Sequence, residues 1–341
     1  MHSFSRNMRH RTGTILAVMI VLVIASLVIA GMTGSVALPL TELPDALMDV
    51  AHGKSTTLAA TLLDLRLSRA LTAFVTGAAL SLAGVMMQAL LRNPLADPYV
   101  LGISAGASVG ALAALLFMCA LWIVDVAAFA GAVTISMLLY LLARRDLRGG
   151  TASEGGASLL LLTGVILSSA CMAVVVLMLS IAPESGLRGM VFWMIGDLSG
   201  APLRALPWLI LAGVTVFALR SARALNVMAL HAEAATTLGI RVGLLRKGLF
   251  FFSGLLTATA VSSAGSIGFV GLIVPHAVRF AFGPDHRLLI PAATLAGGTF
   301  LVLADTLART ILAPQQLPVG VVTAMIGAPV FLYQLHRLRR T

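Results

Sequence analysis

Residues 157–182 read ASLLLLTGVILSSACMAVVVLMLSIA, a stretch without a charged side chain. It exceeds the roughly 20 residues that a helix needs to cross the hydrocarbon core of a bilayer. Similar apolar runs recur along the 341 residues, of which 59% are hydrophobic and only 11% charged, and the mean hydropathy is +1.01. A water-soluble chain of this length cannot bury so much apolar surface. The sequence therefore predicts an all-α, polytopic membrane protein.

Ten membrane crossings are predicted within one domain that covers residues 1–341. An even number places both termini on one side, and seventeen of the 23 Lys and Arg residues fall on that side. Because positive charge accumulates on the cytoplasmic side, the tail 1–12 and the longest inner connection, 221–245, are expected to be cytoplasmic. The crossings are expected near 13–34, 68–91, 99–118, 127–143, 157–182, 204–220, 246–264, 269–281, 289–309 and 320–336.

Three further segments carry structural expectations. The amphipathic stretch 40–65 is expected to lie on the outer membrane surface. Gly102, Gly106 and Gly110 recur every four residues, a pattern that predicts close approach of a neighbouring helix. The segment 265–275 holds three glycines spaced by three residues and then a proline. It predicts a short or broken helix that lines a cavity, because irregular backbone is tolerated there inside a membrane.

Catalytic and metal-binding patterns do not stand out in the sequence. His52–Thr56 resembles the end of a phosphate-binding loop, but Met48 stands where that loop requires a glycine. Cys119 and Cys171 lie in or beside apolar runs, without His or Cys neighbours at zinc-ligand spacing. No set of Ser, His and Asp and no carboxylate pair on one helix face suggests acid–base or nucleophilic chemistry. The chain is therefore not expected to be an enzyme, to bind a nucleotide or to hold a metal.

The acidic residues favour an externally powered transporter. Nearly all of them fall at predicted loops or span ends, and Asp305 precedes Arg309 by one helical turn, so the two are expected to pair locally. A relay of buried carboxylates, as expected of a proton-driven carrier, is not evident. An ion-coupled secondary transporter stays open as an alternative of another class, since backbone carbonyls can bind sodium.

Four motifs follow one another from about residue 65 to the C-terminus. They are LRLSR (65–69) with GVMMQ (84–88), NPLADP (93–98) and LGISAGA (101–107); WMIGDL (193–198); GSIGFVGLIVPH (265–276); and DTLAR (305–309) with LPVG (317–320) and GAPVF (327–331). In this order they resemble the iron-chelate, haem and cobalamin permeases of bacterial ATP-binding-cassette (ABC) importers, the FecCD-like family. The set covers nearly the whole chain, which makes the resemblance specific.

The resemblance implies a type II ABC importer permease in a bacterial inner membrane. It implies a homodimer of this subunit, two cytoplasmic ATPase subunits and a periplasmic substrate-binding protein. No cofactor is expected on this chain, because ATP and Mg would bind at the partner subunits. Nucleic acid is not an expected partner, since the basic residues are scattered between apolar runs.

Two sets of residues are expected to contact partner proteins. Arg66, Arg69 and Arg309 stand among few basic residues on the outer face, where exposed guanidinium groups suit capture of carboxylates on the binding protein. For Arg66 and Arg69 the alternative is anchoring in lipid headgroups. The family's ATPase-coupling segment is similar to residues 230–239, with His231 and Ala232 departing from its usual pattern. Its expected coupling residues are Leu230, Glu233, Ala234, Ala235, Leu238 and Gly239.

The cargo expectation depends on Arg188. This residue lies at the outer end of the fifth predicted span, and a two-fold axis would present two guanidinium groups to the substrate. Paired arginines suit the two propionates of haem, so haem is the expected cargo, with a ferric siderophore or cobalamin as alternatives. The alternative is a structural role, in which Arg188 pairs with Glu184, one helical turn away. His276 and His286 are expected to be structural groups.

Overall fold

The structure is a computed structural model that describes residues 2–34, 36, 41–53, 57–148, 154–201, 203–230 and 232–338. Over these residues the chain is helical and contains no strand. The elements are α1 (His2–Met32), α2 (Leu43–Ala51), α3 (Leu58–Leu91), η1 (Pro98–Leu101), α4 (Ile103–Leu116), α5 (Leu121–Arg148), α6 (Glu154–Ile181), α7 (Glu184–Ile195), α8 (Ala205–Leu230), α9 (Ala232–Thr237), α10 (Val242–Ala264), α11 (Val270–Phe282), α12 (His286–Thr310) and α13 (Val319–Leu338).

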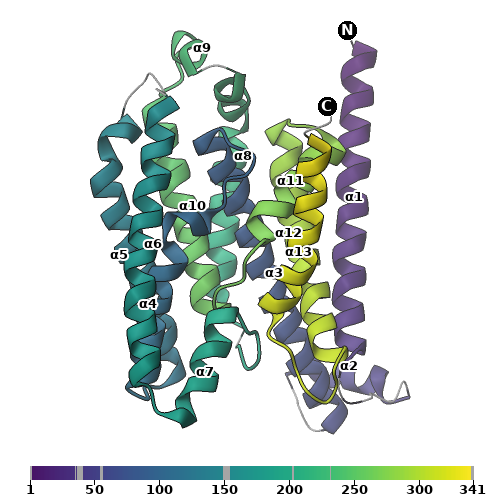
Figure 1. Cartoon of the computed structure of the whole chain (residues 1–341). Helices are drawn as coiled ribbons and strands as arrows, with labels where there is room; N and C mark the ends of the chain where they lie inside the picture. Colours follow the sequence, from purple (N-terminus) through teal and green to yellow (C-terminus); the bar gives the residue numbers. More distant parts are fainter. Residues whose placement is uncertain are drawn as a thin grey trace.

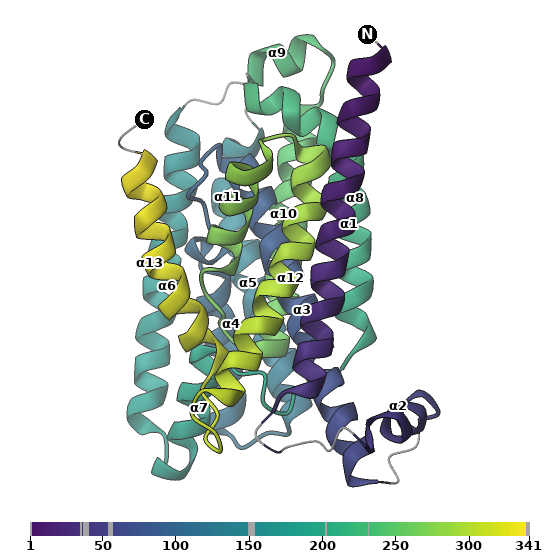
Figure 2. The same cartoon turned by 90° about the vertical axis from the view of Figure 1, so that its right-hand side faces the viewer.

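The predicted fold class is confirmed. Seven of the described helices are long and apolar enough to cross a membrane, and α4, α11 and α13 are shorter apolar helices. These ten coincide in order with the ten predicted crossings. Both termini lie at one end of the bundle together with α9, whereas α2 and α7 lie at the other (Figures 1 and 2). Following the predicted topology, we call these the inner and the outer end.

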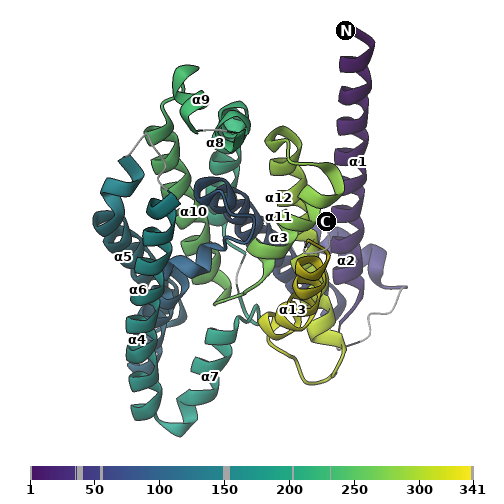
Figure 3. The same cartoon turned by 45° about the horizontal axis from the view of Figure 1, so that its top comes forward.

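Helix α3 forms the centre of the molecule. Figure 3 shows it between one group of helices that includes α4, α5, α6 and α10 and another that includes α1, α11, α12 and α13. Between Arg69 and Arg92 its sequence carries no charged side chain, as expected of a helix surrounded by protein, and 94% of its most apolar 18 residues are buried. Protein therefore replaces lipid around α3, whereas α5 and α6 keep large apolar side chains exposed.

Glycines allow these helices to pack backbone against backbone. A Cβ at Gly84 of α3 would overlap the carbonyl oxygen of Gly271 of α11, and one at Gly77 would overlap that of Gly297 on α12. The predicted stripe on α4 behaves in the same way, because a Cβ at Gly110 would overlap the carbonyl oxygen of Ala127 on α5. Close packing at the stripe is therefore confirmed, as small residues in membrane helices predict.

The outer stretch 40–65 differs from the prediction. Only α2, residues 43–51, lies there as a separate helix, and residues 58–65 are the first turns of α3. Thr57 begins α3 because its hydroxyl accepts a hydrogen bond of 3.1 Å from the backbone N–H of Ala60. Part of the apolar side of this stretch packs between α2 and α3, where Leu63 is buried with Ala46, while Leu58 and Leu65 stay exposed.

The break in the 265–275 segment is confirmed, and its lining of a cavity stays a prediction. Residues 265–269 are not helical, and α11 then begins at Val270. A Cβ at Gly265 would overlap the carbonyl oxygen of Trp193, and Ile267 is fully buried. Ser266 also shares a hydrogen bond of 2.6 Å with Ser104 of α4. The packing of Gly265 and Ile267 thus places part of this irregular backbone against protein, where it is tolerated inside a membrane.

Candidate functional site

Three arginines and one aspartate meet at the outer ends of α1, α3 and α12. The Arg69 guanidinium forms a bidentate ion pair with Asp305. Its Nε donates to both carboxylate oxygens at 3.0 Å, and its Nη2 donates to Oδ1 at 2.8 Å. Arg309 Nε lies 3.1 Å from Asp305 Oδ2, so the predicted local pair is confirmed. The Asp305 side chain is only 1% exposed, which strengthens both interactions by excluding water.

Arg66 and Arg309 also cap the C-terminus of α1. Arg66 donates to the carbonyls of Gly31 at 3.3 Å and Met32 at 3.2 Å, and it also donates to that of Val36. Arg309 donates to the carbonyl of Ala30 at 3.4 Å. The last turn of α1 has no basic residue of its own, so these guanidinium groups supply the positive charge that a helix C-terminus favours.

A cavity of about 610 Å³ opens beside these arginines, and Arg66, Arg69 and Arg309 all line it. Three guanidinium groups face one carboxylate in this cluster, so the cavity carries net positive charge. The expectation that the arginines are exposed is wrong for Arg66 and Arg309, which are 7% and 5% exposed. Arg66 is buried against carbonyls of α1, which are remote from it in sequence. Arg309 is buried against the Ala30 carbonyl of α1 and against Asp305. Their role in docking stays a prediction.

A second cavity, of about 620 Å³, lies at the outer ends of α4 and α5 and along α7. Arg188 on α7 lines it, with its guanidinium carbon 5.2 Å from the centre of the Phe192 ring. Across the cavity, Arg204 forms an ion pair with Asp125 of α5. The alternative pairing of Arg188 with Glu184 is not among the ion pairs of the described residues, and a cation–π contact takes its place.

The segment 196–201 separates the two cavities, and its Gly200 and Ala201 line both of them. Asp197 holds this turn, because its carboxylate accepts the backbone N–H of Ser199 at 2.9 Å and the Ser199 hydroxyl at 2.7 Å. Its own N–H donates to the carbonyl of Ala264 at 3.0 Å. Arg69 reaches the Ser199 hydroxyl at 3.4 Å. The arginine cluster and the Arg188 cavity are therefore linked by polar contacts.

The predicted coupling segment protrudes at the inner end as α9 and the turn after it (Figures 1 and 2). The side chains of Leu230, Glu233 and Ala234 lie outside the described part. Ala235 is fully buried and Leu238 is 70% exposed. Gly239 has a φ of +79° and follows α9, while the N–H of Ile240 donates to the carbonyl of Ala235 at 3.0 Å. This turn presents Leu238 to the outside.

Asn226 on α8 ties the base of this segment to α12. Its amide donates to Asp285 Oδ1 at 2.7 Å, and its carbonyl accepts the backbone N–H and ring Nδ1–H of His286 at 2.9 and 2.8 Å. Burial would raise the pKa of Asp285, but hydrogen bonds from the Arg287 N–H and Asn226 hold it below its ordinary value. The sequence predicted a structural role for His286, but nothing local marked Asn226 as its partner.

Comparison with known proteins assigns the chain to a family of transport proteins. Residues 18–337 match the FecCD transport family. The vitamin B12 import system permease protein BtuC of Escherichia coli O9:H4 (strain HS) is 40% identical over 281 residues, 81% of this chain and 83% of that protein. The cobalamin import system permease protein BtuC of Halobacterium salinarum is 41% identical over 277 residues, 80% of this chain and 72% of that protein.

A solved ABC transporter of the metal-chelate type, in an inward-facing conformation, superposes with a TM-score of 0.81 at 29% sequence identity. The match covers 95% of this chain and 99% of that one. Fold and comparisons together define a membrane-embedded transport permease of the ABC importer class. The chain belongs to the FecCD transport family.

Proposed function

We propose that this chain is the permease of a cobalamin importer. The identity of 40–41% with vitamin B12 and cobalamin permeases, from a bacterium and from an archaeon, carries the proposal. It favours cobalamin over haem, which the sequence alone favoured on the basis of Arg188. A guanidinium group also donates hydrogen bonds to amide carbonyls, so Arg188 suits cobalamin's amide periphery as well as a propionate.

The working assembly contains two copies of this chain, two ATPase subunits and a substrate-binding protein. The family assignment supports this composition, as does the 0.81 TM-score to a solved ABC transporter. Arginines at the inner end support an orientation with both termini in the cytoplasm of a bacterial cell. ATP binding and hydrolysis would take place on the partner subunits, and Leu238, which protrudes at the inner end, would transmit their movement.

Substrate would be delivered at the outer end. The arginine-lined cavity is the docking position we propose for carboxylates of the binding protein, because its net positive charge complements them. The adjoining cavity with Arg188 is the entrance we propose for the cargo. The segment 196–201 borders both cavities, so docking and cargo entry can be coupled through it.

Uptake by the reconstituted complex tests the cargo assignment. The permease is co-expressed with its ATPase subunits, placed in vesicles and supplied with the binding protein, and ATP-dependent uptake of cobalamin, haem and a ferric siderophore is measured. Cobalamin uptake that stops without ATP is expected. Uptake of haem or the siderophore in place of cobalamin contradicts the cargo assignment, and cobalamin uptake driven by an ion gradient without ATP contradicts the mechanism.

A further inference from the structure

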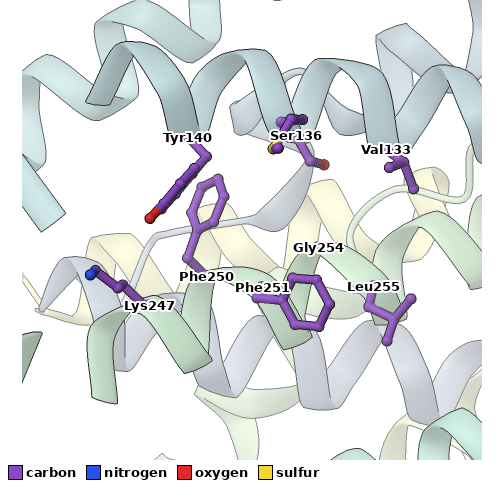
Figure 4. Close-up of a pocket in the computed structure, with 9 residues that line it drawn as sticks. Val133, Ser136, Tyr140, Lys247, Phe250, Phe251, Gly254 and Leu255 are labelled. Carbon is purple, nitrogen blue, oxygen red and sulfur yellow. The ribbon is translucent and has the colours of Figure 1, made fainter. Parts of the chain in front are cut away.

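A groove between α5 and α10 has no part in the proposed transport function. Its volume is about 380 Å³, and the side chains along it are shown in Figure 4. Met137 and Phe251 on its walls are 55% and 62% exposed, on helices that cross the membrane. The groove therefore opens to the side of the bundle, where lipid would surround the protein. Its lining includes Val133, Ser136, Tyr140, Lys247, Phe251 and Leu255.

The groove is polar at one end and apolar at the other. Because α5 runs toward the inner end and α10 away from it, Tyr140 and Lys247 lie together at the inner side, and Val133 and Leu255 lie deeper (Figure 4). Lys247 and Leu255 are eight residues apart on one helix, about 12 Å at 1.5 Å per residue. The hydrocarbon of one leaflet is about 15 Å thick. The groove thus spans most of one leaflet.

Lys247 is the cation at the mouth of the groove. It is one of only two lysines among the 23 basic Lys and Arg residues, and it makes none of the ion pairs found within the described residues. The Ser136 hydroxyl is occupied by its own helix, since it donates to the carbonyl of Ala132 at 2.8 Å. The Tyr140 ring packs 6.2 Å from that of Phe250, centre to centre, and Tyr140 lines the same end of the groove as Lys247 (Figure 4).

We propose that this groove binds one acyl chain of an anionic phospholipid from the inner-end leaflet, with the lipid phosphate at Lys247 and Tyr140. Lysine is a compact charge that suits phosphate, and a juxtamembrane cation attracts anionic lipids. The apolar walls match an acyl chain in chemistry and length.

Lipid titration of the purified full complex tests the proposal. In detergent, dioleoyl phosphatidylglycerol and dioleoyl phosphatidylcholine are added separately, and the thermal unfolding midpoint is followed. We expect phosphatidylglycerol to raise the midpoint at lower concentration than phosphatidylcholine. Lys247→Gln should weaken the apparent affinity for phosphatidylglycerol about fivefold, as loss of one cation at a membrane surface predicts, and Lys247→Arg should largely restore it. Arg223→Gln, which removes an exposed cation on α8 at the same end, is the matched control and should change nothing.

A second variant separates lipid from protein as the occupant. Leu255→Trp fills the deep end of the groove and should lower the response to both lipids, while the permease stays dimeric by native mass spectrometry. The proposal is overturned if the two lipids act alike on the unmodified complex or if Lys247→Gln responds as the unmodified protein does. It is also overturned if Leu255→Trp dissociates the dimer but leaves the lipid response intact, because the groove then belongs to a protein interface.

Discussion

Arg69 on α3 and Asp305 on α12 lie 236 positions apart in sequence and form a bidentate ion pair at the outer end. This pair joins the central helix to α12, while Arg309 approaches the same carboxylate from within α12. The carboxylate therefore keeps two guanidinium groups together that would otherwise repel each other. It also holds both at the wall of the proposed docking cavity.

Asp305→Asn should destabilise the protein strongly. The substitution leaves buried guanidinium groups without their counter-charge, and breaking a buried pair in this way costs about 3–5 kcal/mol. The thermal unfolding midpoint of the purified complex measures the effect. Asp125→Asn is the matched control, because the Asp125–Arg204 pair is more exposed, at 20% and 37%, and such pairs contribute about 0–1 kcal/mol. Equal midpoints for the two variants would show that Asp305 has no special role.

Gly84→Ala should also destabilise the protein, by overpacking. The new methyl group would overlap the backbone carbonyl of Gly271, and backbone cannot move aside as the end of a side chain can. A cost of at least about 1–3 kcal/mol is expected from insertion of one methyl into a packed core. Gly213→Ala is the control, since a Cβ there meets nothing within 4 Å and alanine favours helix by about 0.8–1.0 kcal/mol. Opposite shifts in unfolding midpoint are expected, and a stable Gly84→Ala would disprove the packing argument.

Much of the fold could be predicted because the bilayer imposes it. An apolar run of spanning length has to be a helix in lipid, so the apolar runs of the sequence predicted the seven long helices and the three shorter apolar ones in their order. Small residues at regular spacing likewise marked the α4–α5 contact. The start of α3 was misplaced because residues 58–67 are amphipathic, and the sequence does not say whether α2 or the membrane covers their apolar side.

The candidate site was only partly predictable. Arg66, Arg69 and Arg309 were recognised as a group, but the burial of Arg66 and Arg309 was not, since both donate to α1 carbonyls that are distant in sequence. The partner of Arg69 is a carboxylate 236 positions away. Asn226 escaped notice for the same reason, because its partners His286 and Asp285 lie 60 and 59 positions away. Local spacing predicts local pairs such as Asp305 with Arg309, whereas contacts between distant helices require the packed structure.

The docking prediction needs a variant that changes charge without removing a buried arginine. Gln316 is suitable, because it lines the cavity and its side-chain oxygen accepts from Arg69 Nη1 at 2.8 Å. Gln316→Glu keeps the acceptor but adds a negative charge, so it should weaken affinity for the binding protein and reduce the salt dependence of binding. Gln315→Glu places the same charge on the neighbouring exposed position. If surface-based binding assays give both variants the same affinity, the cavity is not the docking position.

The coupling prediction can be focused on Leu238. Ala235 is buried within this chain, so a tryptophan there would disturb α9 itself and would not isolate a partner contact. Leu238→Asp places a charge on an exposed apolar side chain and should disrupt its seating in an apolar cleft of an ATPase subunit. Binding-protein-stimulated ATP hydrolysis and uptake should fall together, whereas Leu238→Met should retain both. Unchanged coupling in Leu238→Asp would assign the contact to other residues of the segment.

Arg188 is predicted to act on the cargo, and its role can be separated from assembly. Arg188→Ala removes the guanidinium group from the cavity wall and should reduce ATP-dependent cobalamin uptake about tenfold, the loss expected when a charged donor of about 1.5 kcal/mol is removed from a recognition site. ATPase activity without substrate should stay unchanged, because Arg188 packs on Phe192 and makes no ion pair among the described residues.

Arg188→Lys should recover uptake only in part, since lysine cannot donate in the planar fork geometry of arginine. Arg204→Ala serves as the comparison, because it removes a guanidinium group that lines the same cavity but is already paired with Asp125. Full uptake in Arg188→Ala would remove this residue from the transport pathway.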